Sequence, residues 1–416
     1  LDRAFGQLTD RLTDNYPFGH PNYVGQMLKP PHPAAVLGYV SAMLINPNNH
    51  ALDGGPATAQ MEKEVVARLA TMFGLREHLG HLTSSGTIAN LEALWVARES
   101  HPGKRIAYSA DAHYTHSRMC QVIGVEGVAI ATDAAGRMDL AALERELATG
   151  TVGTVVATLG TTGLGALDPL PQIVALARAH GARVHVDTAY GGFFALIADD
   201  SADGVARAPF AAIADVDSIV VDPHKHGLQP YGCGAVLFAD PSVGRFYVHD
   251  SPYTYFSSDE LHLGEISLEC SRAGAAAAAL WLTLEVIPLT DAGLGQVLRA
   301  NRAGAREWAG LLAQSDTLVA YQEPELDIVT YFPRRDSMSA IDAASHALFV
   351  DAAALPPERQ LHLATYAVKP GGLADRGHAV TADAQVARIM RSTVMKPESA
   401  ERIGDIHRTL EELSRA

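Results

Sequence analysis

Short apolar runs rich in β-branched residues alternate along this chain with stretches of helical periodicity. Met61, Val65, Leu69 and Met72 repeat at helical spacing, and Gly74 follows them as a typical helix stop. Further helices are predicted after Asp139 and over 171–180. We expect strands over 105–109, 128–131, 154–159, 183–187, 218–221 and 235–238. Because such strands alternate with helices, the pattern predicts an α/β domain with a mostly parallel sheet.

The pattern changes at both ends of the chain. Residues 16–56 are rich in Pro and Asn and show little periodicity, so they must lie across another surface to be ordered. After Pro288 come a helix (294–314), a strand-like run (326–332), an Ala-rich helix and a terminal helix from Pro397. We therefore expect an N-terminal arm (1–56), a large α/β domain (57–290) and a small C-terminal α+β domain (291–416). The arm is expected to lie on the main domain or on a partner subunit, and it also predicts a homodimer.

Composition and charge narrow the class of protein. The chain has 416 residues, and 48% of them are apolar, which excludes a disordered or fibrous protein. A net charge of −15 argues against nucleic acid as the partner. The most apolar stretch, 273–284, is too short to cross a bilayer, so no membrane partner is expected. The three cysteines form no C-x-x-C pair, which favours the reducing cytoplasm over a disulfide framework.

Small hydroxyl residues and a glycine precede a predicted helix in the run L-T-S-S-G-T-I-A-N (82–90). A helix N-terminus offers unpaired N–H groups and the positive end of the helix dipole, so Ser85, Gly86 and Thr87 could bind a phosphate. Ordinary N-capping by Ser or Thr is the alternative interpretation.

Two predicted strands end at residues with candidate chemistry. Asp187 closes the run 183–187, where ligands of open α/β sheets bind, although it could instead cap the next helix. Lys225 lies just past the run 218–221, between His224 and His226. A lysine held in a desolvated site beside other cationic groups has a lowered pKa and becomes a Schiff-base nucleophile. A surface loop is the alternative place for Lys225, but the apolar strands on both sides argue against it.

The histidines allow a different interpretation. Asp111, His113 and His116, with His224 and His226, have spacings that could supply metal ligands. This interpretation leaves Lys225 and Asp187 without roles, and we predict no metal site.

Five motifs in order carry a family resemblance: T-S-S-G-T-I-A-N-L (83–91), D-A-H-Y (111–114), A-T-L-G-T-T-G (157–163), H-V-D-T-A-Y-G-G (185–192) and D-P-H-K-H-G (222–227). From about Phe18 to Pro397 the chain resembles the pyridoxal-phosphate-dependent group II amino acid decarboxylases. The resemblance implies the aspartate-aminotransferase-like fold (PLP fold type I), pyridoxal 5'-phosphate as cofactor, and a homodimer with active sites shared between subunits.

The resemblance also implies roles for individual residues. It places Lys225 in a Schiff base with the cofactor, Asp187 on the pyridine nitrogen and His113 against the ring. The phosphate contacts, the ring-lining residues and the residue before the lysine would be Ser85, Gly86, Thr87, Thr162, Ala189 and His224. In the run I-M-R-S-T (389–393), Arg391 is the candidate for binding the substrate carboxylate, and His20 is a further substrate candidate.

The polar run 249–260 contains two tyrosines and reads as a loop. In related decarboxylases a loop tyrosine near this point delivers the proton to the substrate, so Tyr253 or Tyr255 is the candidate proton donor. The alternative is that both are interface aromatics.

The leading hypothesis is therefore decarboxylation of an L-α-amino acid to its amine and carbon dioxide. The run H-K-H-G-L-Q-P-Y-G (224–232) is also similar to sphingosine-phosphate lyase, so a carbon–carbon lyase or a decarboxylation-dependent amine oxidase is the alternative within the same cofactor class. A scaffold that keeps the fold only for partner binding is the alternative outside enzymes. The motifs leave the amino acid substrate open, because side-chain specificity depends on the loops that shape the pocket.

Overall fold

The computed structural model describes residues 1–248 and 262–415. The chain divides into two compact units. The large unit contains Pro31–Arg302 and Pro324–Leu326, and the small unit contains Leu1–Pro30, Ala303–Glu323 and Asp327–Ala416. The predicted arm is therefore divided between the two units at residue 30.

In the described part of the large unit, seven strands form one sheet in the order β1-β7-β6-β5-β4-β2-β3. Strands β3, β2, β4, β5 and β6 are parallel, and β7 is antiparallel to both of its neighbours, β6 and β1. This arrangement confirms the predicted α/β fold with a mostly parallel sheet. The strands are β1 (Leu79–Thr83), β2 (Arg105–Ser109), β3 (Gly127–Ile130), β4 (Val152–Thr158), β5 (Arg183–Asp187), β6 (Ser218–Val221) and β7 (Gly234–Phe238).

Strand β1 was not predicted, although all five of its residues are buried. Gly80 and His81 interrupt its apolar pattern, so it lacks the β-branched signature of the other strands. A Cβ atom on Gly80 would lie 2.6 Å from the carbonyl oxygen of Val236 on β7, so the close pairing of the two strands requires glycine.

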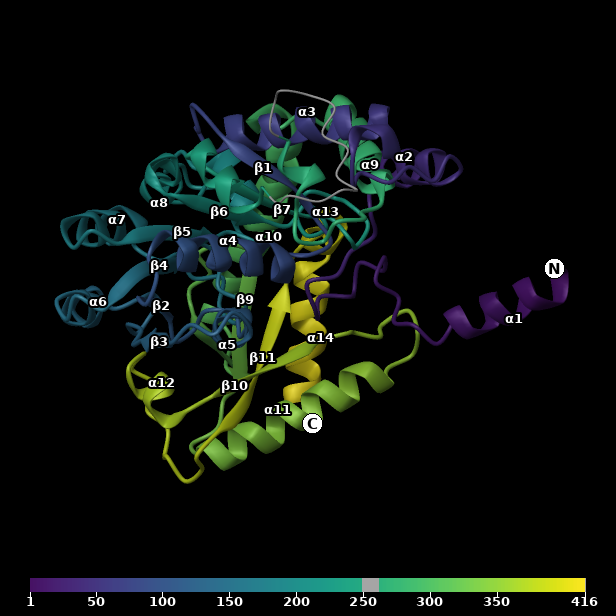
Figure 1. The fold of residues 1–416 in the computed structure, drawn as a ribbon. Helices are drawn as coiled ribbons and strands as arrows, with labels where there is room; N and C mark the ends of the chain where they lie inside the picture. Colours follow the sequence, from purple (N-terminus) through teal and green to yellow (C-terminus); the bar gives the residue numbers. More distant parts are fainter. Residues whose placement is uncertain (249–261, 416) are drawn as a thin grey trace. The chain divides into compact units, whose positions relative to one another are not determined.

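Helices cover the sheet of the large unit. Helix α4 packs against β6 and β7, and α7 packs against β4 and β5 (Figure 1). The predicted helices before Gly74, after Asp139 and over 171–180 correspond to α3, α6 and α7. The helices are α2 (Pro33–Met43), α3 (Pro56–Met72), α4 (Gly86–Ser100), α5 (Thr115–Val122), α6 (Leu140–Leu147), α7 (Leu170–Ala179), α8 (Arg207–Ala211) and α9 (Gly274–Val286).

Helix α2 corrects the expectation that residues 16–56 are irregular throughout. It packs along α9 through small residues, and its Ala35, Gly38 and Ala42 are buried. A Cβ atom on Gly38 would lie 2.9 Å from the carbonyl oxygen of Ala278 on α9. Close packing between the two helices therefore orders this stretch. Because the buried positions of α2 are Ala and Gly, the sequence shows only a weak hydrophobic periodicity there.

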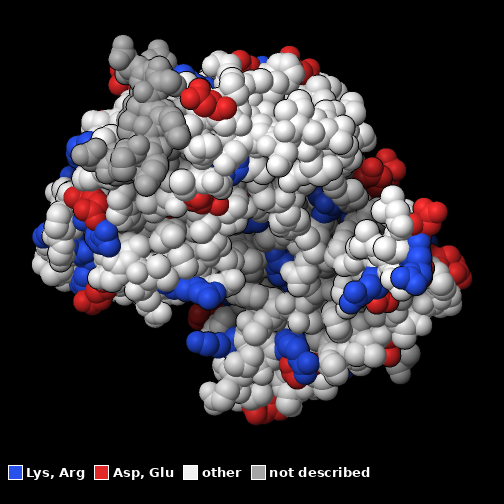
Figure 2. All heavy atoms as spheres, turned by 45° about the vertical axis from the view of Figure 1, so that its right-hand side comes forward, with Lys and Arg blue, Asp and Glu red and all other residues white. Residues whose placement is uncertain are grey.

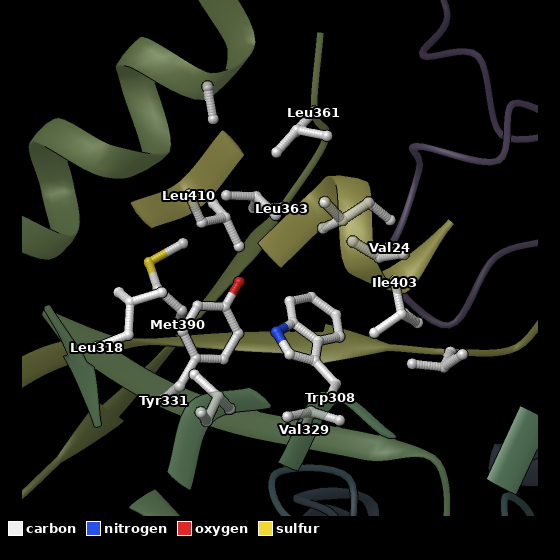
Figure 3. Packing of buried hydrophobic residues seen from close by; sticks show 14 of the residues in the cluster. Val24, Trp308, Leu318, Val329, Tyr331, Leu361, Leu363, Met390, Ile403 and Leu410 are labelled. Atoms are coloured by element: carbon white, nitrogen blue, oxygen red, sulfur yellow. The ribbon is translucent and has the colours of Figure 1, made fainter. Parts of the chain in front are cut away.

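The small unit is built on an antiparallel sheet of strands in the order β10-β11-β9-β8. Its core cluster includes Trp308 beside Tyr331, with ring centroids 5.2 Å apart, and Met390 on β11 (Figure 3). Strand β9 confirms the strand expected at 326–332, whereas the other three strands were not predicted. The strands are β8 (Leu318–Gln322), β9 (Ile328–Pro333), β10 (Ala364–Val368) and β11 (Ala387–Thr393). The helices are α1 (Asp2–Leu12), α10 (Gln296–Ala313, which begins in the large unit), α11 (Met338–Ala354), α12 (Pro370–Ala374), α13 (Pro397–Ala400) and α14 (Ile403–Arg415).

Charged side chains of both signs are interspersed over the face shown in Figure 2. Within the described residues, no single helix is both long and apolar enough to cross a membrane. A bent pair of helices, 274–286 and 291–313, passes the same test only when the two are taken together, by length and composition alone.

Candidate active site

The candidate site lies where β4, β5 and β6 end. These three strands are adjacent and parallel, with Thr158 paired to Asp187 and Asp187 paired to Val220, so their carboxyl ends share one edge of the sheet. A pocket of about 250 Å³ opens there. It is lined by Ser85, Gly86, Thr87, Asn90, His113, Tyr114, Thr115, Thr158, Gly160, Thr162, Asp187, Ala189, Tyr190, Asp222, His224 and Lys225.

The N-terminus of α4 forms one wall of this pocket. Ser85 is the N-cap, and its Oγ accepts a hydrogen bond from the backbone N–H of Ile88 at 3.3 Å, so the capping interpretation holds. The hydroxyl hydrogen can still be donated to a ligand, and the first N–H groups of a helix have no partner within the helix. A Cβ atom on Gly86 would lie 2.6 Å from Asp222 Oδ2, so only glycine allows this close approach. The wall is therefore suited to an anionic group.

Asp187 is buried at the end of β5 and accepts three hydrogen bonds. His116 Nε2 lies 2.9 Å from Oδ2, the Asn90 amide nitrogen lies 3.3 Å from Oδ2, and the N–H of Ala189 lies 2.9 Å from Oδ1. Burial by itself would raise the pKa of Asp187, but the hydrogen bond from His116, with the Ala189 bond and the Lys225 charge, holds the pKa well below its usual range. Asp187 is therefore an anion at neutral pH.

Lys225 follows β6 in a tight turn that also carries Asp222. Its Nζ lies 3.2 Å from Asp222 Oδ2, and its side chain is 20% exposed, so the ammonium group faces the pocket rather than open solvent. The neighbouring His224 donates from Nδ1 to the carbonyl oxygen of Cys233 at 2.8 Å, and burial lowers its pKa. The alternative place for Lys225, a surface loop, is thereby excluded.

His113 forms part of the wall beside α5. Its Nδ1 lies 2.7 Å from Thr115 Oγ1, and its ring lies beside that of Tyr114 with centroids 4.3 Å apart. Burial lowers the pKa of His113 against the opposing charge of Asp187, which favours the neutral ring at pH 7. The contact with Thr115 fixes the orientation of the His113 ring.

The structure thus brings together all the predicted cofactor residues on one pocket. Sequence reasoning gave no role to six of its polar members. Five of them lie inside the quoted motifs and one directly follows a motif: Asn90, Tyr114, Thr158, Tyr190 and Asp222, and then Thr115. Sequence reasoning also missed the contact of His116 with Asp187. Groups of three or more His, Cys, Asp or Glu placed to hold a metal ion are absent from the described residues.

Two of the remaining predicted residues belong to the small unit. Arg391 is buried on β11 of the small unit, between Ala364 of β10 and Thr330 of β9. His20, also in the small unit, accepts at Nδ1 from the N–H of Asn22 at 3.1 Å. Their roles toward the substrate stay predictions. Tyr253 and Tyr255 lie outside the described residues.

A lysine, a buried carboxylate and a helix N-terminus around one pocket fit the class of pyridoxal-phosphate-dependent enzymes. Residues 18–331 match the pyridoxal-dependent decarboxylase conserved domain, and the chain belongs to that family.

Individual relatives agree with this assignment. The chain is 30% identical to an L-tyrosine decarboxylase of Enterococcus faecium, in a match that covers 70% of this chain and 64% of that protein's length. It is 27% identical to an L-aspartate decarboxylase of Thermococcus kodakarensis, with 79% and 84% covered. Among solved structures, mouse CSAD matches with a TM-score of 0.82 at 23% identity, over 95% of this chain and 84% of that one. These matches confirm the predicted family and PLP fold type I, and the relatives support the decarboxylation of an amino acid.

The pocket residues fit pyridoxal phosphate, the cofactor of this family. The α4 N-terminus suits the phosphate, Asp187 suits a protonated ring nitrogen, and Lys225 suits covalent attachment. Two buried polar atoms of the wall, Thr158 Oγ1 and Asp222 Oδ1, have no hydrogen-bond partner within the described residues, as expected of a wall built for a polar ligand.

Proposed function

We propose that this protein is a pyridoxal-phosphate-dependent decarboxylase that converts an L-α-amino acid into its amine and carbon dioxide. The observation that carries the proposal is the convergence of Lys225, Asp187 and the α4 N-terminus on one pocket of about 250 Å³. Membership in the decarboxylase family supports the type of reaction.

Each group has a distinct task in this proposal. When bound, pyridoxal phosphate supplies an electron sink for the pair released as the carboxylate leaves Cα. Asp187, as an anion, holds a proton on the cofactor's ring nitrogen. Lys225 Nζ would hold the cofactor, and Asp222 beside it would fix the position of the amine. His113 offers the face of a neutral ring, oriented by Thr115.

The test is a substrate screen of the purified holoenzyme. The twenty amino acids, with ornithine, diaminobutyrate and cysteate, are each assayed for carbon dioxide and for amine. We expect both products in equal amounts from at least one L-amino acid. An aldehyde without matching amine would instead identify the amine oxidase, and cleavage without carbon dioxide would identify the carbon–carbon lyase. The matched control is Lys225→Ala, which should release neither product.

We also propose a homodimer. Helices α1 and α2 each carry exposed apolar residues, and a second copy of the chain that covers these faces would remove them from water. The exposed residues are Phe5, Leu8 and Leu12 on α1, Val36, Leu37, Val40 and Met43 on α2, and Leu44 and Ile45 directly after α2.

The dimer is tested by light scattering of the wild type and of a Leu37→Glu, Val40→Glu variant. We expect a dimer for the wild type and a shift toward monomer for the variant. A catalytically active wild-type monomer would contradict the proposal. Lys104→Glu, at an exposed position outside α1 and α2, is the control for added negative charge.

A further inference from the structure

Asp187 is held by side chains from two helices that the proposed reaction has not yet used. His116 comes from α5 and Asn90 from α4, and both are almost fully buried. Each donates a hydrogen bond to Oδ2 of Asp187. A carboxylate can accept about four hydrogen bonds, so these donors leave room for a further donor such as a ring N–H.

The surroundings of His116 decide its charge. Its Nε2 lies 2.9 Å from Asp187 Oδ2, whereas its buried Nδ1 has no hydrogen-bond partner within the described residues. A proton on Nδ1 would be a buried, unpaired donor, which is costly. We therefore assign the neutral tautomer that carries its hydrogen on Nε2. A neutral donor stabilises the Asp187 anion without cancelling its charge, whereas an imidazolium would compete with the cofactor's ring nitrogen for that charge.

Asn90 is oriented by a chain of hydrogen bonds behind it. Burial lowers the pKa of His185 to about 3, so this histidine is neutral and carries one hydrogen. Ser218 Oγ donates to His185 Nδ1 at 2.9 Å, and His185 Nε2 donates to Asn90 Oδ1 at 2.9 Å. The Asn90 amide nitrogen is thereby turned toward Asp187.

Asn90 also connects the two ends of the pocket. Its amide nitrogen donates both to Asp187 and, at 2.9 Å, to the carbonyl oxygen of Gly86 at the start of α4. One side chain therefore couples the carboxylate for the ring nitrogen to the helix turn for the phosphate.

We propose that His116 and Asn90 are positioning residues whose hydrogen bonds keep Asp187 less basic than the cofactor's ring nitrogen, so that the shared proton stays on the ring. This inference rests on the proposed function only where it makes the ring proton important for the reaction. The position of that proton is a property of the bound cofactor and can be measured without turnover. Other charged or titratable groups near Asp187 are His113, Lys225, His185 and Asp222. They remain in place in the variants below.

The test is nitrogen-15 NMR of the holoenzyme reconstituted with pyridoxal phosphate labelled at the ring nitrogen. His116→Phe keeps an aromatic ring beside Tyr108 but removes the donor, and Asn90→Ala removes the second donor. Because a hydrogen bond to a charged group is lost in each case, the proton's distribution should shift toward Asp187 by about ten- to a hundredfold. The ring-nitrogen signal should move toward its unprotonated position, more in His116→Phe than in Asn90→Ala.

Two variants serve as controls. Tyr108→Phe removes only the hydroxyl group from the ring that stacks on His116, with centroids 6.3 Å apart, and should keep the wild-type signal. His116→Gln supplies an N–H at a similar reach and should restore most of that signal. A wild-type signal in both His116→Phe and Asn90→Ala would overturn the inference, and if His116→Phe does not fold, Asn90→Ala decides alone.

The readout also separates this inference from the proposed function. If the wild type releases no carbon dioxide from any amino acid but the signal moves as expected, the proposed reaction fails and the inference stands. If carbon dioxide is released but the signal does not move, the inference fails alone.

Discussion

The core of the small unit and the pocket edge of the large sheet bury opposite kinds of side chain. The small unit packs Trp308, Tyr331 and Met390 in an apolar cluster, which is stabilised by burial and dispersion (Figure 3). The edge of the large sheet buries Asp187, His116 and His185, and burying such groups is costly unless each is hydrogen-bonded. The comparison separates residues that stabilise the fold from residues that are placed for chemistry. It predicts that variants of the small-unit core lose stability, whereas variants of the pocket lose activity.

The largest effect is expected at Lys225. Lys225→Ala removes the nucleophile and should lower the decarboxylation rate by about ten-thousandfold or more, because covalent attachment has no substitute in the pocket. Borohydride reduction followed by peptide mapping should fix the cofactor on Lys225 in the wild type and nowhere in the variant. The thermal midpoint of apoprotein unfolding should be nearly unchanged, since the side chain is partly exposed. Labelling of another lysine in the wild type would refute this role.

Trp308→Ala should show the reverse behaviour. Trp308 is fully buried in the small-unit cluster, and its truncation should lower the free energy of unfolding by about 3–5 kcal/mol, the usual cost of removing a buried tryptophan side chain. Denaturant titration measures the loss. A decrease below about 1 kcal/mol would show that this cluster contributes far less than its burial indicates.

Asp187→Asn should keep the cofactor but slow decarboxylation by about a hundred- to a thousandfold, because a neutral amide cannot stabilise charge on the ring nitrogen. Cofactor content by absorbance and turnover are measured on the same sample. The substitution is nearly isosteric, so the fold is expected to hold. Turnover close to the wild type would remove Asp187 from the mechanism.

The smallest effect concerns pH. Burial lowers the pKa of His185 from 6.5 to about 3, so between these values the unfolded chain binds the proton and the folded chain does not. The stabilisation is therefore complete above pH 6.5 and is lost as the pH falls toward 3. Denaturant unfolding at several pH values should show a weaker acid dependence for His185→Gln than for the wild type. Trp308→Ala should keep the wild-type dependence, and equal dependence in all three proteins would contradict the assignment.

The sequence by itself determined the parallel strands, the residues at their carboxyl ends and the family. Strand ends, helix starts and glycine turns are local features, so Asp187, Lys225 and Ser85 to Thr87 could be recognised without a structure. The order of motifs then sufficed to identify the cofactor.

Only the tertiary structure decided which side chains support those residues. His116 is separated from Asp187 by 71 positions and Asn90 by 97, and neither spacing carries a signal in one sequence. Strand β1 and helix α2 were missed for a related reason, because each is stabilised by close contact with β7 or α9 through glycine. Contacts between elements depend on how their faces pack. Hydrophobic periodicity predicts that a face is buried, but it does not identify the element that the face packs against.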